Sequence, residues 1–329
     1  MQLRHSLLVI LLLLFGIAPM RGQIQMGEWR THLPYQYAFL VESTSDRVFC
    51  STTGGLFYYK LDDHLVEKLS MVDGLSDNGV SAMRWNSELA TLILAYENSN
   101  LDIIRDGVVM NLPDIMKKQI TGDKSIYDIY YLGNKAYLST GFGIVVLNLE
   151  KEEISETYII GDNGQTLKVN QLASDGTYLY AATDRGIRRG LLSDPLLVDY
   201  NAWEIVTDIP NYGAAFGAIA YYSGSLFASF DDPADEQDQL YYSSGNGWVP
   251  YPYFTGALCN EILNQGDFLT LVDDTAVHLI NDDLLIVQQL FSNSPRSASI
   301  DNQGDLWLAD YGRGLVTNEG GGSWTIKPN

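Results

Sequence analysis

Short stretches in which apolar and polar positions alternate recur along the chain, each followed by a turn and a second, more apolar run. The four clearest copies are "VFCSTTGGLFYY" (48–59), "AYLSTGFGIVVL" (136–147), "LYAATDRGIRRG" (179–190) and "LWLADYGRGLVTN" (306–318). The weaker copies are "LILAYENSNLDII" (92–104), "LFASFDD" (226–232) and "FLTLVDDTAVHLI" (268–280). Alternation with a period of two predicts β-strands, and the breaks rich in Gly, Asn and Asp predict tight turns between them.

The copies return about every 40 to 45 residues, a period typical of the four-stranded blade of a β-propeller. The repeats begin near residues 37, 80, 126, 169, 216, 259 and 297. One repeat is too short to cover both faces of its own sheet, so neighbouring repeats must pack together. We therefore predict an all-β fold, a seven-bladed β-propeller of four-stranded antiparallel blades, over residues 23–329.

Large side chains occupy the second position of the motif strands. Because strand residues alternate between the two faces of a sheet, these side chains can fill the space between neighbouring blades. We expect burial between blades for Phe49, Tyr137, Tyr180, Phe227 and Trp307. The strand before each motif, such as "VNQLAS" (169–174), is interpreted as an outer strand of its blade.

The fourth strand of several repeats opens with a tryptophan. Trp203, Trp248 and Trp324 stand at this position, and Trp29 resembles the same element displaced to the N-terminus. An N-terminal strand that completed the last blade would close the ring and remove its open edge, but the segment at Trp324 fits the same place, so both alternatives stay open. The run "VPYPYF" (249–254) is interpreted as a packed outer strand, with a sugar-stacking ledge as the alternative.

The first 22 residues have the features of a secretory signal peptide. Arg4 and His5 precede an apolar run over residues 7–15, and small residues lead to a cut near Gly22. No later apolar stretch is long enough to cross a bilayer. We therefore expect an exported chain with no transmembrane segment after the signal is cleaved.

Acidic residues dominate the charged composition. The chain has 41 Asp and Glu against 20 Lys and Arg, a formal net charge of −21, which argues against a nucleic-acid partner. We interpret the acidic surface first as a source of solubility, with a cationic partner as the alternative. The cysteines, Cys50 and Cys259, are too few for a disulfide framework and are predicted to be two buried thiols.

A search for catalytic motifs yields no candidate. The sequence has no Gly-x-Ser-x-Gly elbow, phosphate loop or His-Glu-x-x-His motif. His32, His64 and His278 lie in different repeats without ligand spacing, so we predict neither a metal site nor a cofactor. The acidic segment "DDPADEQDQ" (231–239) is interpreted as a solvated insertion, with calcium binding as the alternative, because it lacks the central Gly of a calcium loop. The protein is predicted not to be an enzyme.

The scarce basic residues form two groups. Arg185, Arg188 and Arg189 follow the motif of the fourth repeat, and Lys117 and Lys118 lie between the second and third repeats. In an acidic protein such groups are candidates to bind the phosphate or carboxylate groups of a ligand. The alternative is that they pair with neighbouring Asp and Glu.

The repeats resemble a known family. "LYAATDRGI" is similar to the propeller repeat of two-component regulators, which is found in periplasmic sensor regions of Bacteroidetes. More narrowly, the chain resembles the N-terminal propeller of the PorZ family of the type IX secretion system. The stretches that carry this resemblance include "GEWRTHLPYQYA" (27–38), "MVDGLSDNGVSAMRWN" (71–86), "STGFGIVVLNLE" (139–150) and "YIIGDNGQTLKVNQLASDGTYLYAATDRGI" (158–187).

This resemblance implies a function. Members of the PorZ family sit in an attachment complex with the sortase PorU, PorV and PorQ, bind anionic lipopolysaccharide and present it to the sortase. It implies a non-enzymatic binding and assembly module in the periplasm or at the cell surface of a Gram-negative bacterium. The alternatives are a periplasmic ligand-sensing propeller of a hybrid two-component regulator and a propeller enzyme that acts on polysaccharide.

Overall fold

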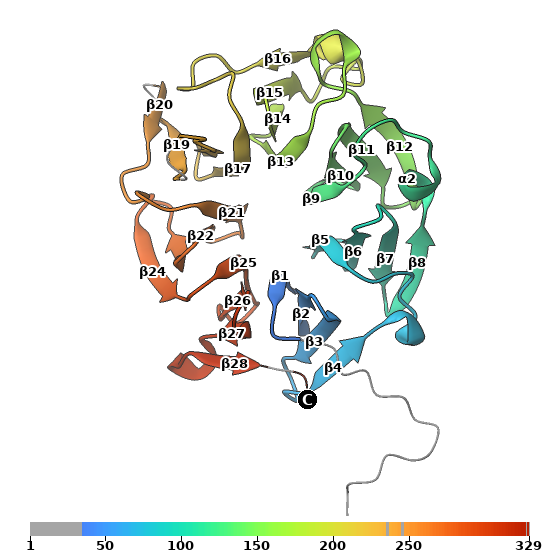
Figure 1. The fold of residues 1–329 in the computed structure, drawn as a ribbon, viewed down its shortest axis with the longest axis vertical. Helices are drawn as coiled ribbons and strands as arrows, with labels where there is room; N and C mark the ends of the chain where they lie inside the picture. The colour runs from blue at the N-terminus through green and yellow to red at the C-terminus, as the bar shows by residue number, and fades with distance from the viewer. Residues whose placement is uncertain (1–34, 235–236, 245–246, 327, 329) are drawn as a thin grey trace, which may run out of the picture. The chain divides into compact units, whose positions relative to one another are not determined.

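The computed structural model describes residues 35–234, 237–244, 247–326 and 328. In this part of the chain 28 strands form seven four-stranded antiparallel sheets, each built from consecutive strands. The sheets stand around a common axis as the blades of a ring (Figure 1). The predicted seven-bladed all-β propeller is therefore confirmed. The predicted signal peptide, residues 1–22, and the segment around Trp29 lie outside the described residues.

The blades follow one another in chain order. Blades one to four consist of β1 (Ala38–Ser43), β2 (Arg47–Thr52), β3 (Gly55–Lys60) and β4 (Val66–Leu69); β5 (Val80–Asn86), β6 (Thr91–Tyr96), β7 (Leu101–Arg105) and β8 (Val108–Leu112); β9 (Ile126–Leu132), β10 (Lys135–Thr140), β11 (Gly143–Asn148) and β12 (Glu153–Tyr158); and β13 (Val169–Ser174), β14 (Tyr178–Thr183), β15 (Gly186–Leu191) and β16 (Trp203–Ile205).

Blades five to seven continue the same order. They consist of β17 (Phe216–Tyr222), β18 (Ser225–Phe230), β19 (Gln239–Ser244) and β20 (Gly247–Pro250); β21 (Cys259–Asn264), β22 (Leu269–Asp273), β23 (Ala276–Ile280) and β24 (Ile286–Phe291); and β25 (Pro295–Ile300), β26 (Leu306–Asp310), β27 (Gly314–Thr317) and β28 (Trp324–Ile326). The helical elements of the described chain are short: α2 (Asp114–Lys117) and the 3-10 turns η1 (Met71–Asp73), η2 (Asp162–Gly164), η3 (Tyr200–Ala202) and η4 (Glu319–Gly321).

The first strand of each blade lies at the axis of the ring. Figure 1 shows β1, β5, β9, β13, β17, β21 and β25 around the centre. The interpretation of this strand as an outer one was therefore wrong. The outermost strands are instead short and partly exposed, as in β12, where Glu153, Ser155 and Glu156 face solvent. Alternation alone cannot tell the two edges of a sheet apart, because both edge strands carry polar residues.

Each first strand contains a bulge. The pairing with the second strand skips the second residue of the first strand in every blade. A bulge of this kind bends the strand and increases its twist, and it leaves one residue outside the ladder. The skipped residues are Phe39, Ser81, Tyr127, Asn170, Gly217, Asn260 and Arg296.

The hydrophobic core is divided into seven clusters, one between each pair of neighbouring blades. Between blades two and three, for example, Ile93 and Leu101 share a cluster with Leu138 and Val145. The large motif residues predicted to fill these spaces are confirmed as buried, with exposed fractions between 0% and 6%: Phe49, Tyr137, Tyr180, Phe227 and Trp307.

Tight turns join the second and third strands. Gly143 and Gly186 have φ angles of 144° and 92°, and a Cβ atom would lie 2.2 Å from the Tyr158 carbonyl oxygen and 2.1 Å from that of Tyr212, respectively. Only glycine avoids both the strain and the clash at these places. The turn residues that mark the repeat in the sequence are therefore required by close approach of the backbone.

The ring is closed by the C-terminal segment. Trp324 opens β28, which pairs with β27, so blade seven takes all four of its strands from residues 295–326. Trp203 and Trp248 likewise lie in the fourth strands of their blades, as predicted. Side chains join blade seven to blade one: the Ser43 N–H donates to Ser299 Oγ at 2.9 Å.

The seam clusters generate a stability prediction. Trp307 is fully buried between blades seven and one, and its Nε1–H donates to Asp301 Oδ2 at 2.8 Å. We expect Trp307→Ala to lower the free energy of unfolding by about 3 to 5 kcal/mol, because it leaves a cavity in the seam. Urea denaturation measures the loss. Trp324→Ala, at a side chain that is 39% exposed, is the matched control and should cost less than half as much. Equal losses would contradict the assignment of the core to the seams.

Candidate functional site

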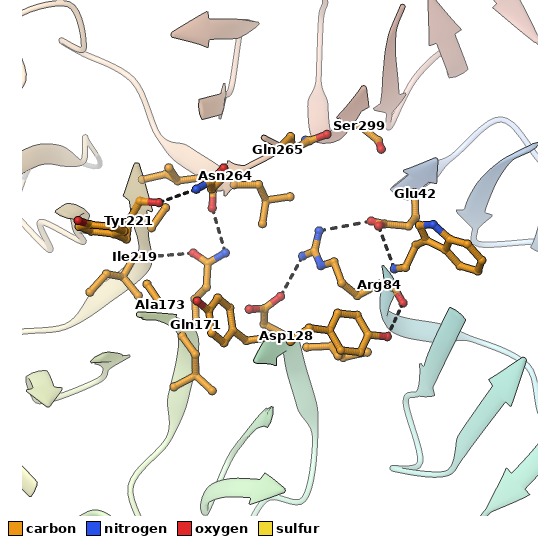
Figure 2. Close-up of a pocket in the computed structure, with 18 of the residues that line it drawn as sticks. Glu42, Arg84, Asp128, Gln171, Ala173, Ile219, Tyr221, Asn264, Gln265 and Ser299 are labelled. Atoms are coloured by element: carbon orange, nitrogen blue, oxygen red, sulfur yellow. Dashed lines mark hydrogen bonds and ion pairs between the residues drawn. The ribbon is translucent and has the colours of Figure 1, made fainter. Parts of the chain in front are cut away.

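A cavity of about 490 Å³ lies in the central channel of the ring. Its wall takes residues from the first strand of all seven blades, so no single blade forms the site (Figure 2). The lining residues come mainly from the C-terminal halves of these strands. Backbone and side-chain polar groups alternate there with the aromatic rings of Trp85, Tyr130, Tyr131 and Tyr221.

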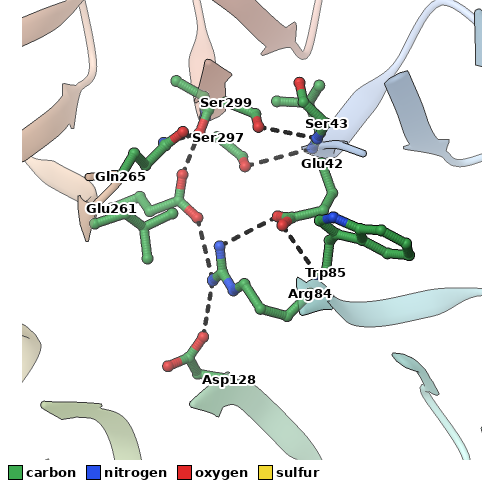
Figure 3. Close-up of polar contacts among 12 residues, drawn as sticks. Glu42, Ser43, Arg84, Trp85, Asp128, Glu261, Gln265, Ser297 and Ser299 are labelled. Atoms are coloured by element: carbon green, nitrogen blue, oxygen red, sulfur yellow. Dashed lines mark hydrogen bonds and ion pairs between the residues drawn. The ribbon is translucent and has the colours of Figure 1, made fainter. Parts of the chain in front are cut away.

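Arg84 forms the centre of the cavity floor. Its Nη1 lies 3.4 Å from Glu42 Oε2 of blade one, and its Nη2 donates to Asp128 Oδ1 of blade three at 2.9 Å (Figure 3). The same Nη2 lies 3.8 Å from Glu261 Oε1 of blade six. One guanidinium from blade two therefore contacts carboxylates from three other blades across the channel.

Burial perturbs the acids around Arg84. It raises the pKa of Glu42 to about 7, although the Arg84 charge and the Trp85 N–H both lower this pKa. Burial likewise raises the pKa of Glu261 to about 7, against the effects of Arg84 and the Ala298 N–H. Burial lowers the pKa of Arg84, but the three carboxylates raise it above its ordinary value. Arg84 stays charged, while two of its partners titrate near neutral pH.

Neutral side chains connect the remaining first strands. Gln171 of blade four accepts the Ile219 N–H of blade five at 2.9 Å, and its Nε2–H donates to the Ile262 carbonyl of blade six at 3.0 Å. Asn264 Nδ2–H donates to the Tyr221 carbonyl at 2.8 Å (Figure 2). Hydrogen bonds from side chains, rather than a backbone ladder, therefore connect the first strands of these blades.

Sequence reasoning missed this cavity. When the repeats are aligned on the bulge of the first strand, Asp128, Gln171 and Glu261 follow the bulge by one residue, and Glu42 and Arg84 follow it by three. Residues two apart on a strand share a face. An alignment of the first strands, rather than of the motif strands, could have placed these five side chains together.

Two of the predicted ligand-binding residues are paired with acids. Arg188 is 6% exposed, and its guanidinium donates to both carboxylate oxygens of Asp162, at 2.7 and 3.0 Å. Arg189, its neighbour on β15, donates to Glu204 at 2.7 Å and lies 4.9 Å from the centre of the Tyr178 ring. Successive strand residues face opposite ways, so these arginines do not form one basic patch.

The other three predicted residues lie at one face of the ring. Arg185 sits in the turn between β14 and β15, and Lys117 and Lys118 lie in the connection from blade two to blade three. In an antiparallel blade, second-to-third turns and blade-to-blade connections lie at the same end. The lysines line a pocket of about 540 Å³ beside α2, above apolar residues such as Ile115 and Phe142; the arginines do not line this pocket.

Lys124, which does not line the lysine pocket, binds the end of α2 beside it. Lys124 Nζ donates to the carbonyl oxygens of Ile115, Met116 and Lys118 at 3.3, 2.7 and 3.4 Å, which satisfies groups at the C-terminal end of α2. The side chains of Lys117 and Lys118 are exposed, and neither has a hydrogen-bond or ion-pair partner among the described residues.

The remaining candidate residues lie apart. Cys50 in blade one is buried and Cys259 in blade six is half-buried, and both are free thiols whose pKa is raised by burial. His64 and His278 belong to blades one and six, and His32 lies outside the described residues. Among the described residues, no group of three or more His, Cys, Asp or Glu is arranged to hold a metal ion.

Two segments had open alternatives, the run 249–254 and the acidic segment 231–239. In the run 249–254 the strand β20 ends at Pro250, so the predicted strand is shorter than this run. Tyr251 and Phe254 are buried in the turn that follows, while Tyr253 is 51% exposed. The acidic segment 231–239 includes residues 235–236, which lie outside the described chain. Burial and the nearby Asp238 raise the pKa of Asp231 to about 6.

The channel acids generate a pH prediction. The folded state holds the protons of Glu42 and Glu261 up to about pH 7, whereas the unfolded chain releases them near pH 4.5. Between these values the folded state binds more protons, so the free energy of unfolding falls as pH rises. Glu42→Gln should make this fall smaller by on the order of 1 kcal/mol between pH 5 and 7.

Urea denaturation at pH 5, 6 and 7 measures this slope. Glu88→Gln removes the same charge from an exposed site outside the cavity and should leave the slope unchanged. An identical slope in Glu42→Gln and in the unsubstituted protein would contradict the raised pKa of Glu42.

Comparison with solved structures places the ring among known propellers. PorZ, described as an essential bacterial surface component of the type-IX secretion system of Porphyromonas gingivalis, superposes with a TM-score of 0.76 at 20% identity over 92% of this chain and 39% of that one. The extracellular domain of the putative one-component system BT4673 from B. thetaiotaomicron gives 0.62 at 12% identity, over 86% and 38%. BamB from Moraxella catarrhalis gives 0.51 at 12% identity, over 89% and 84%.

Comparison of the sequence distinguishes among proteins that share this fold. No curated protein sequence matches the chain significantly. Residues 48–204 match the family model described as "TSS9, PorZ, N-terminal beta-propeller domain". The chain spans 39% of the length of the solved PorZ structure. This match confirms the resemblance predicted from the sequence: residues 48–204 are similar to the N-terminal β-propeller domain of PorZ.

Proposed function

We propose that this chain is an exported, non-enzymatic binding and assembly module of the type IX secretion system. The observation that carries the proposal is the match of residues 48–204 to the PorZ N-terminal propeller. None of the helices in the described part of the chain is long and apolar enough to cross a membrane.

The chemistry of the channel supports binding rather than catalysis. At its floor Arg84 pairs with Glu42 and Asp128, and the described cavity lining contains no cysteine or histidine that could act as a nucleophile or base. A general base needs a partner within hydrogen-bond reach whose proton it can take. Glu42 and Asp128 are instead engaged with the permanently charged Arg84.

The proposed ligand is an anionic lipopolysaccharide, presented to a sortase. Lys117 and Lys118 provide unpaired positive charge above an apolar floor, and Arg185 lies at the same face of the ring. Phosphate or carboxylate groups can bind such cations. We expect Arg188 and Arg189 to contribute less to ligand binding, because they already form ion pairs with Asp162 and Glu204.

The proposed protein partners are the sortase PorU, PorV and PorQ. A sensing function is the second candidate, because an extracellular domain of a putative one-component system has the same fold with a TM-score of 0.62. Pull-down from cell envelopes with the tagged chain distinguishes the two. We expect enrichment of the sortase complex. Enrichment of a membrane-bound regulator without any sortase component would favour the sensing function instead.

The lysine pocket generates a binding prediction. Replacing Lys117 and Lys118 together with Ala should weaken binding of anionic lipopolysaccharide about tenfold, because each lost charge-assisted contact is worth roughly 0.5 to 1 kcal/mol. Surface plasmon resonance at two salt concentrations measures the effect, and binding by the unsubstituted chain should weaken at the higher salt.

Lys151→Ala is the matched control for this experiment. Lys151 is an exposed lysine of the same blade region, but it lies near Glu153 and outside the pocket. Its removal should leave binding unchanged. Equal weakening in Lys151→Ala, or unaltered binding in the double variant, would contradict the placement of the ligand.

A further inference from the structure

The floor of the channel cavity holds an excess of negative charge. Glu42 and Asp128 line the cavity, and Glu261, which does not line it, lies 3.8 Å from Arg84. The three acidic side chains are 11%, 10% and 12% exposed, and the basic group among them is Arg84, at 19%. Among the described residues that line the cavity, no other side chain carries a positive charge. Charges withdrawn from water in this way need counter-charges, and one guanidinium cannot neutralise three carboxylates.

Two oxygens of the cavity lining are also without a hydrogen-bond donor. Asp128 Oδ1 accepts from Arg84, but Oδ2 makes no hydrogen bond to another described residue. Ser43 Oγ, on the cavity wall, is buried and has no hydrogen-bond partner in the described ring. A ligand with several N–H donors could satisfy these atoms together.

The wall of the cavity suits a flat cation. Trp85, Tyr130, Tyr131 and Tyr221 are half-buried and line the cavity together with the charged floor. Aromatic faces attract cations, and a guanidinium both stacks on such a face and donates to carboxylates through its planar fork. A volume of about 490 Å³ admits a slender side chain or small molecule and excludes a folded domain.

We infer that the channel cavity is a binding site for a guanidinium group, held by Asp128 beside Glu42 and Arg84. The net charge of −21 favours the approach of any cation. The group belongs either to a free small molecule or to an arginine side chain at the surface of a partner protein. This site is separate from the lysine pocket, so it does not rest on the proposed function.

Isothermal titration calorimetry with agmatine at pH 8 tests the site. We expect binding by the unsubstituted chain and at least tenfold weaker binding by Asp128→Asn, whose amide oxygen can still accept the Arg84 bond. Glu88→Gln removes a carboxylate charge outside the cavity and should bind as the unsubstituted chain does. Should Asp128→Asn fail to fold by circular dichroism, Glu42→Gln serves in its place.

Three further probes identify the chemistry and its source. A blocked Gly-Gly-Arg-Gly-Gly peptide that binds as well as agmatine supports a protein side chain, whereas binding of agmatine alone supports a free small molecule. The same peptide with citrulline in place of arginine should not bind, because it lacks the charge. Agmatine binding should weaken several-fold at pH 5.5. At that pH Glu42 and Glu261 are largely protonated, so less negative charge remains beside Arg84, Asp128 and the neutral tyrosines of the wall.

The inference is overturned by any of four results. These are no binding of agmatine, equal binding by the citrulline peptide, equal weakening in Glu88→Gln and Asp128→Asn, and tighter binding of cadaverine than of agmatine. The last would assign the cavity to ammonium groups rather than to guanidinium groups. None of these results bears on the lysine pocket or on the sortase partners.

Discussion

The sheet of each blade is apolar on both faces, and neither face can stay in water. Every blade therefore depends on two neighbours, and seven cores replace the single core of an ordinary domain. Large side chains such as Tyr180 and Phe227 fill the seams, while small ones such as Ala181 and Ala228 in the same strands allow the sheets to converge. The closed ring is the arrangement that leaves no apolar face uncovered.

The same constraint sets the chemistry at the axis. Blades that converge on a channel bring their first strands close together without forming a backbone ladder across the seams, so side chains must bond the exposed backbone groups. Glu42 accepts the Trp85 N–H, and Gln171 accepts the Ile219 N–H. Arg84 and its acids extend this bonding across the channel. Buried ion pairs of this type contribute more to a unique arrangement than to stability, because desolvation offsets much of their attraction.

The sequence was sufficient for the architecture because the repeat is a local property. Blade number, strand number and the buried residues all follow from a period that depends on turns such as the one at Gly186. The position of a blade edge relative to the axis is not local, and the first strands were misassigned for that reason. The pairing of Arg188 with Asp162 and the meeting of Arg84 with Glu261 join residues 26 and 177 positions apart, and single-chain periodicity contains no information on such contacts.

The bulge in every first strand has a consequence for how such a ring can change. A residue that the ladder skips is free of the cross-strand neighbours that restrict its replacement, and here the seven equivalent positions hold two aromatics, a serine, two asparagines, a glycine and an arginine. Asn170 and Asn260 use this freedom to donate to carbonyls of the next blade, at 2.9 and 2.8 Å. Side-chain chemistry can therefore differ from blade to blade at these equivalent positions without a change in the ladder. Gly217 is the exception, because an added Cβ atom would lie 2.6 Å from Asp231 Oδ1.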